Sequence, residues 1–254
     1  MESRWIDRLL RMLAVAVAAV SVSPVQARDL VVGVEAIDYS PVYGYRDGQF
    51  TGAGREILDA FAQARGYRMV YQAYPVKRLL AELLHGGIDL KFPDSPDWQQ
   101  SLRQGRGISY SRPVIAYIDG TVVRRERLGL KLGDVQGIGT VAGFTPFAWQ
   151  EHIQAGKVEL KENPSFEQLL RQVQAGRIDG AYVNVAVALS AAETLLAPPG
   201  ALAFAPTLPH IAESYRLSSL KVPEVIAEFD AWLADNRSLV ADIIARTGAE
   251  RGVR

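Results

Sequence analysis

The feature that most constrains the fold of this chain is a helix–glycine–strand unit that occurs twice, with 90 residues between equivalent positions. The first copy lies within residues 74–98, and the second is the segment LLRQVQAGRIDGAYVN at residues 169–184. In both copies, apolar residues at helical spacing predict one buried stripe, and the glycine that follows suits the left-handed end of a helix. A short apolar run then predicts a strand. The repeat therefore predicts two similar α/β lobes, although such units also recur by chance in α/β proteins.

Two polar residues occupy equivalent places in the copies. Asp94 and Asn184 both stand immediately past the predicted strand. In open α/β sheets, ligands bind at the carboxyl ends of the strands. We therefore expect both side chains to face a cleft between the lobes. Asp89 and Asp179 instead stand at the entry of each strand, where we expect them to cap backbone groups.

The segments around the two copies extend the alternation of strands and helices. Strands are predicted at 30–35 and 67–74, with a helix at 54–65 between them. Together with the first copy, this order predicts a parallel sheet with crossover helices. A hairpin turn is predicted at Asp47-Gly48, and a break at Asp119-Gly120. Chain crossings between the lobes are predicted near 118–123 and 202–210. The remaining predictions are a strand within 134–144, a helix at 147–155 with Thr145 as N-cap, a cap at Ser165, and two helices within 223–247 broken near Asn236.

The first 27 residues have the pattern of a signal peptide. Three arginines precede a short apolar run at 12–22, and Val25-Gln26-Ala27 supplies small residues at a cleavage site. The run is shorter than the roughly 20 residues that span a bilayer. We expect cleavage after Ala27 and a periplasmic protein; an uncleaved anchor is the alternative. The sequence has no cysteine, so neither a disulfide nor a lipid anchor at the junction is expected.

Charge and composition narrow the class of function. Subtracting the three arginines, Glu2 and Asp7 of the signal segment from 28 basic and 28 acidic residues leaves 25 and 26. This balance argues against a nucleic-acid partner, which requires a basic face. The three histidines, His85, His152 and His210, lack metal-ligand spacing, so we expect no metal site. The familiar nucleophile motifs are also absent from the sequence, and we predict no catalytic residue and no cofactor.

Four motifs in sequence order carry a resemblance to a known family. They are DYSPVYGYRDGQFTGAGREILDAFAQARG, YPVKRLLAELLHGGIDLKF, DVQGIGTVAGFTP and GRIDGAYVNVAVALS. Their order and spacing resemble the periplasmic solute-binding proteins of the amino-acid-type class (family 3), the extracytoplasmic receptors of ABC importers. The resemblance implies the type II periplasmic binding fold: α/β, with two similar lobes around a ligand cleft, joined by two hinge crossings. We expect a signal peptide at 1–27, a first lobe at 28–119 plus 208–254, and a second lobe at 120–207.

The resemblance also implies which residues contact the ligand. Tyr39 and Tyr43 match the paired rings that wall the cleft in this family. Phe144 and Thr145 match the start of a helix in the second lobe, where free backbone N–H groups hold an anionic group. The expected ligand is a small polar molecule, captured by a monomer and presented to the membrane permease of an ABC importer.

Two departures from the family pattern affect the expected ligand. The family arginine that clamps a ligand carboxylate is absent from the segment Ser95-Pro96-Asp97-Trp98, and Asn184 stands in place of the family aspartate. We include Asp94 and Trp98 in the predicted site, because an acid with aromatic rings suits a cationic or hydroxyl-rich ligand. The candidate substitutes for the missing arginine are Arg78, Arg103 and Arg106, and Arg78 is included in the predicted site. Standard α-amino acids are expected to bind weakly.

Simpler structural roles and other functions stay open at this point. Asp94 suits an Asx-turn, Trp98 suits the core, and Arg78 suits a solvated helix face. A binding protein that signals to a membrane sensor is the alternative to transport. A dehydratase-like lyase on the same fold is a third candidate, with Asp94 or Glu151 as its general acid.

Overall fold

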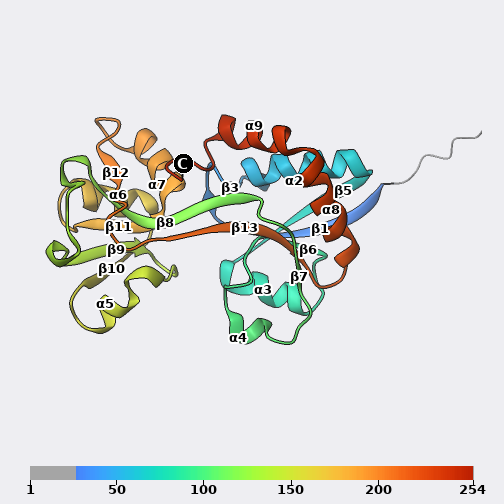
Figure 1. Ribbon diagram of the computed structural model, residues 1–254, viewed down its shortest axis with the longest axis horizontal. Coiled ribbons are helices and arrows are strands. Elements are labelled where there is room, and N and C mark those ends of the chain that lie inside the picture. Colours follow the sequence, from blue (N-terminus) through green and yellow to red (C-terminus); the bar gives the residue numbers. More distant parts are fainter. Residues whose placement is uncertain (1–26, 254) are drawn as a thin grey trace, which may run out of the picture.

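The structure is a computed structural model that describes residues 27–253. The predicted signal segment falls, except for Ala27, outside the described residues. Two groups of strands and helices stand at opposite ends of the molecule, and two long strands run between them (Figure 1). These strands are β8 (Ile115–Arg124) and β13 (Ile211–Ser219), which pair with each other in antiparallel fashion. Within the described residues, no helix combines the length and apolar character that a membrane span requires.

The first lobe is built on three parallel strands. β1 (Arg28–Glu35) lies between β5 (Tyr67–Tyr74) and β6 (Leu90–Asp94), as the alternation in the sequence predicts. A three-stranded sheet follows β1 and consists of β2 (Asp38–Tyr39), β3 (Tyr43–Arg46) and β4 (Gln49–Thr51). The other elements of this half are α2 (Ala53–Arg65), α3 (Val76–Leu84), α4 (Gln100–Arg103) and β7 (Ser109–Tyr110).

The second lobe has the same parallel arrangement. β9 (Gly137–Val141) lies between β10 (Glu159–Asn163) and β11 (Gly180–Asn184). β8 joins this sheet by pairing with β11, so the strands form one path of order β10-β9-β11-β8-β13-β6-β1-β5. The other elements are 3-10 turns at Arg125–Arg127, Leu132–Asp134 and Phe147–Trp149, with α5 (Gln150–Gln154), α6 (Phe166–Gln174), α7 (Val185–Leu195) and β12 (Leu202–Phe204).

The internal repeat is confirmed in position and in packing. The bounds of α3 and α6 differ by 90 residues, as do those of β6 and β11. Each helix packs its apolar stripe against a glycine on the neighbouring strand. A Cβ built on Gly33 would lie 2.7 Å from Leu79, and one built on Gly139 would lie 2.5 Å from Leu169. The same helix therefore approaches the same strand in both lobes, which chance recurrence does not explain.

The strand-entry aspartates cap backbone groups, as predicted. Asp89 accepts a hydrogen bond from the N–H of Val31 at 2.9 Å, and Asp179 accepts one from Gln136 at 2.8 Å. Ser165 is also confirmed as an N-cap, because its hydroxyl accepts from the N–H of Gln168. The polar groups of the three side chains are thus engaged by backbone N–H groups.

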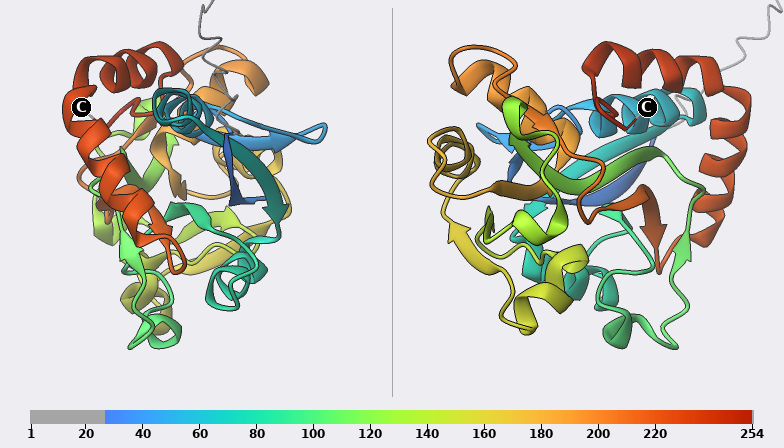
Figure 2. Two further views of the ribbon diagram at one scale, coloured as in Figure 1. Left: turned by 90° about the vertical axis from the view of Figure 1, so that its right-hand side faces the viewer. Right: turned by 60° about the vertical axis from the view of Figure 1, so that its left-hand side comes forward.

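The chain ends on two helices that pack on the first lobe. α8 (Pro223–Asp235) and α9 (Arg237–Thr247) are separated at Asn236, as predicted, and they lie beside α2 in both views of Figure 2. Phe61 of α2 contacts the rings of Phe229 and Trp232 at centroid distances of 5.0 and 5.8 Å. Trp232 is therefore a core residue.

Two local predictions are wrong. Asp119-Gly120 does not break the chain but lies inside β8, because β11 and β13 pair with this strand and hold it extended. Thr145 does not cap a helix. It is exposed and is followed by a 3-10 turn that is anchored by the buried Trp149, whose indole N–H donates to Thr121 Oγ1 at 2.9 Å. The five-residue α5 begins only after that turn.

Candidate functional site

Aromatic rings from both lobes meet where the paired strands β8 and β13 run from one lobe to the other. Tyr39 packs on Tyr43 of its own lobe at a centroid distance of 5.0 Å. On its other sides it reaches Phe144 and Phe166 of the second lobe at 5.7 and 5.8 Å. The predicted residues Tyr39, Tyr43 and Phe144 are thus brought together, and Tyr39 joins the two lobes.

The crossing strands add two further tyrosines to this contact. Tyr215 of β13 stacks on Tyr117 of β8 at 4.2 Å and meets the edge of Tyr43 at 6.1 Å. Trp98, half-buried on the first lobe, contacts Tyr215 at 6.0 Å, so it lines this contact as well as the core. We call the set the interlobe aromatic group: Tyr39, Tyr43, Trp98, Tyr117, Phe144, Phe166 and Tyr215.

Asp94 is the centre of a buried ion cluster. Arg103 donates to both of its oxygens, at 2.7 and 3.0 Å, and Lys91 donates to Oδ1 at 2.7 Å. Ser218 of β13 donates to Oδ2 at 2.5 Å. Burial opposes ionisation, but the charges of Lys91 and Arg103 outweigh it and hold the pKa of Asp94 below its usual value. The expectation that a ligand cation must meet Asp94 is therefore corrected, because protein groups neutralise this charge.

A second buried acid, Glu35, lies next to this cluster at the end of β1. Tyr43 donates its hydroxyl to Glu35 Oε2 at 2.5 Å. Burial raises the pKa of Glu35, although the charge of Lys91 opposes that rise. The hydroxyl of Tyr43 is thus committed to Glu35, while its ring stays in the aromatic group.

Asn184, the counterpart of Asp94, also has a structural role. Its Oδ1 accepts from the N–H of Val187 at 3.1 Å and so caps α7, and its Nδ2 donates to the hydroxyl of Tyr215 at 3.1 Å. The prediction that Asn184 faces the region between the lobes agrees with its contact to Tyr215. Its amide orients that tyrosine.

The three candidate arginines do not form a free clamp. Arg103 is buried and its guanidinium is occupied by Asp94 and by the hydroxyl of Tyr110 at 2.7 Å. Arg78 lies on the exposed face of α3, where it pairs with Glu82 at 2.8 Å. Arg106 is also exposed. Because α5 is so short, the predicted helix N-terminus at Phe144 and Thr145 does not supply an anion site either.

Asp119 differs from Asp94 and Glu35, because its side chain is half-buried and no group in residues 27–253 neutralises it. Its Oδ1 is cut off from solvent, and no residue between 27 and 253 forms a hydrogen bond or ion pair with its carboxylate. Burial alone raises the pKa of this carboxyl to about 7. Its charge adds to the effect of burial in raising the pKa of four nearby tyrosines, Tyr39, Tyr117, Tyr182 and Tyr215.

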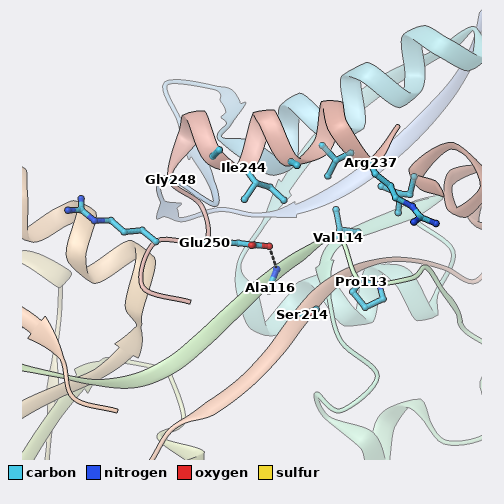
Figure 3. A pocket seen from close by; sticks show the side chains of 13 residues that line it. Pro113, Val114, Ala116, Ser214, Arg237, Ile244, Gly248 and Glu250 are labelled. Atoms are coloured by element: carbon cyan, nitrogen blue, oxygen red, sulfur yellow. Dashed lines mark hydrogen bonds between the residues drawn. The ribbon is translucent and has the colours of Figure 1, made fainter. Parts of the chain in front are cut away.

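Two surface hollows lie elsewhere. One of about 810 Å³ opens between α9 and the crossing strands and is lined by Val114, Ser214 and Ile244, with Glu250 accepting a hydrogen bond from Ala116 at its edge (Figure 3). The other, of about 640 Å³, lies beside the 3-10 turn Arg125–Arg127. Neither includes a residue of the interlobe aromatic group. The described residues also hold no group of three or more potential metal ligands.

The arrangement of two lobes and two crossing strands is the type II periplasmic binding fold. Solved structures of periplasmic binding proteins and related domains resemble this chain in fold. A histidine kinase sensor domain with similarity to periplasmic binding proteins superposes with a TM-score of 0.66 at 20% identity, covering 87% of this chain and 96% of that chain. The amino acid ABC transporter substrate-binding protein AbpA from Streptococcus pneumoniae, bound to L-arginine, gives 0.64 at 19% identity, covering 87% and 94%.

A third similar structure is the ancestral amino-acid-binding protein AncCDT-1, a precursor of cyclohexadienyl dehydratase. It gives a TM-score of 0.65 at 17% identity, covering 86% of this chain and 95% of that chain. No family model and no curated protein matches the sequence. At these identities, the likeness shows the fold.

Sequence reasoning missed Asp119 and Lys91. Lys91 interrupts the apolar strand segment Leu90–Asp94, and a cation in a buried strand is a signal for a nearby buried acid. Asp119 interrupts the apolar run of β8, but its neighbour Gly120 gave the pair the form of a turn.

Proposed function

We propose that this protein is a periplasmic solute-binding protein that captures a small polar ligand between its lobes. The observation that supports this most is the contact of Tyr39 with Phe144 and Phe166, which brings rings from both lobes to the crossing of β8 and β13. Aromatic faces with few polar groups among them are typical of small-molecule sites.

The connection between the lobes suits hinge closure. We assign the first lobe to residues 28–119 plus 208–254 and the second to 120–207. In this division, β8 and β13 carry the chain across, and each lobe keeps its own parallel strands and buried core. Lobes joined in this way move as near-rigid bodies about the crossing. Because Tyr39 packs directly on the second lobe, a ligand enters when the lobes part and is enclosed when they close.

Delivery to the permease of an ABC importer is the proposed role, for a monomer exported and cleaved after Ala27. A second candidate, presentation of the ligand to a membrane sensor, is favoured by the likeness to a histidine kinase sensor domain. We propose binding without catalysis. Of the two acids considered for a lyase, Asp94 is ionised and paired, and Glu151 is exposed on α5.

A thermal-shift screen of small polar metabolites tests the proposal. Ligand at about 100 times its dissociation constant adds roughly 2.7 kcal/mol to the free energy of unfolding. For any compound that stabilises the protein, Tyr39→Ala should abolish the shift, because it removes the ring that joins the lobes. Tyr74→Ala is the control, since Tyr74 lies on β5 and its hydroxyl donates to Gln72.

The closure itself is measured by small-angle scattering, which should show a smaller radius of gyration at saturation. The proposed interlobe site would be contradicted if no compound in the screen stabilised the protein. A ligand that binds Tyr39→Ala as tightly as the wild type would also contradict it.

A further inference from the structure

The carboxylate of Asp119 occupies a position that connects the hinge with the aromatic contact. In the antiparallel register, Asp119 stands opposite Asn184 of β11 on one side and Ile211 of β13 on the other. Side chains alternate along a strand, so Asp119 shares a face with Tyr117 two residues before it, and with its cross-strand neighbour Asn184. Tyr117 stacks on Tyr215, which receives the hydrogen bond from Asn184. Asp119 is therefore bordered by the interlobe aromatic group.

The buried cations of the first lobe do not neutralise Asp119, because both are held by other groups. Lys91 donates to Asp94 and to the carbonyl oxygen of Pro93 at 2.6 Å, and Arg103 is held by Asp94 in two hydrogen bonds. Among the described residues, no charged group lowers the pKa of Asp119. A buried carboxylate without a partner is unfavourable, and it favours any bound group that brings a positive charge to it.

The surroundings of this carboxylate suit an organic cation. Tyr39, Tyr117 and Tyr215 are buried tyrosines whose rings contact other rings of the group. Aromatic faces attract ammonium and guanidinium groups, most strongly where water is excluded. A metal ion is a poor match, because no group of three or more potential metal ligands occurs in residues 27–253.

We propose that Asp119, on the crossing strand β8, is the anionic subsite that binds the cationic end of the ligand, an alkylammonium or guanidinium group enclosed by tyrosine rings. This inference rests on the proposed binding function and specifies the ligand class. The acid that pairs with the ligand's positive charge is then Asp119 in the hinge, in place of Asp94 at the strand end. Because Asp119 lies where the chain passes between the lobes, a cation bound to it contacts both lobes when they close.

The test uses pairs of compounds that differ in charge but little in shape. They are choline with its uncharged tert-butyl analogue, butylguanidinium with butylurea, and L-arginine with L-citrulline. The protein is expressed from the full-length chain, and affinities are measured by calorimetry and thermal shift. We expect at least one cation to bind about tenfold or more tightly than its neutral partner, because it gains the ion pair with Asp119 and the contact with the aromatic rings, and guanidinium groups add charge-assisted hydrogen bonds. This comparison needs no variant.

Asp119→Asn, which keeps the side-chain shape, should remove that preference and reduce cation affinity by a similar factor. Asp47→Asn is the matched control: it makes the same change of charge in an exposed turn at a positive φ that asparagine tolerates. It should leave the affinity unchanged. Equal binding within every pair, tighter binding of a neutral member, or cation binding that survives in Asp119→Asn overturns the inference but leaves the binding function standing. Failure of every compound in these pairs at millimolar concentration overturns the cationic ligand class, and failure of the wider metabolite screen overturns the binding function too.

Discussion

Asp119→Asn should make the ligand-free protein more stable at neutral and alkaline pH. The substitution replaces a carboxyl whose Oδ1 is buried, and which has no partner in residues 27–253, with a neutral amide of nearly the same shape. Burial raises the pKa of this group from 3.8 to about 7. The folded protein therefore binds the proton more tightly than the unfolded chain, and ionisation above the unfolded value works against folding.

The sign and size of the effect follow from that pKa. Below the unfolded value of 3.8, the carboxyl is neutral in both states and the wild type and variant should be equally stable. As the pH rises towards 7, the wild type loses stability, and above that value the loss is constant. At about 1.4 kcal/mol per pKa unit, a rise of about three units gives an upper bound of about 4 kcal/mol. Solvent around the half-buried side chain screens part of this, so we expect about 2–3 kcal/mol.

Chemical denaturation of both proteins at about pH 5 and about pH 8 measures the difference. The gap between Asp119→Asn and wild type should be about 1 kcal/mol at the lower pH, which already exceeds the unfolded pKa of 3.8, and should grow to about 2–3 kcal/mol at the higher pH. Asp47→Asn should follow the wild type at both values. A variant that is no more stable than wild type at pH 8, or a gap independent of pH, would refute the reasoning that Asp119 is buried and unpaired.

Two further predictions concern the other charged residues and the export segment. Arg103→Met should destabilise the protein by about 3 kcal/mol, because it removes a bidentate partner from the buried Asp94. Arg78→Met should change stability by less than about 0.5 kcal/mol, because the ion pair of Arg78 with Glu82 is exposed. Urea titrations compare the two, and equal losses would contradict the assignment. Protein recovered from the periplasm should have the mass of a chain cleaved after Ala27; precursor mass in the membrane fraction would show an uncleaved anchor.

The elements of the repeat were predictable from sequence because local patterns determine them. The buried stripe of α3 is formed by leucines at helical spacing, and Gly86 has a φ of +74°, the left-handed conformation that ends the helix. Gly176 has the same role after α6, with a φ of +69°. The strand begins at the same distance after the glycine in both copies. The helix, glycine and strand of each copy lie within about twenty residues of chain, so local sequence patterns suffice to predict that the two lobes are alike.

The partners of Asp94 were not predictable as a set, because they combine two side chains near it in the sequence with one from a distant segment. Asp94 receives hydrogen bonds from Lys91, Arg103 and Ser218, and the last of these lies 124 residues away in the chain. An acid after an apolar strand therefore has the same sequence pattern whether it is paired or free. Asp119 posed the opposite difficulty: Asp-Gly is a turn signal, and only pairing with β11 and β13 keeps this pair extended.

The pairing of charges supports the proposed anionic subsite on the crossing strand. Asp94, at the end of β6, fastens that strand to α4 through Arg103 and to β13 through Ser218. Asn184, at the end of β11, caps α7 and holds Tyr215. Both strand ends are thus occupied by structural hydrogen bonds, whereas Asp119, whose carboxylate has no partner in residues 27–253, lies on the crossing strand. In a hinge protein, a ligand that binds at the crossing stabilises the closed state through contacts that the open state lacks. Affinity and closure should therefore be coupled through Asp119: a substitution there that weakens binding should also reduce the ligand-induced change in the radius of gyration at equal ligand concentration.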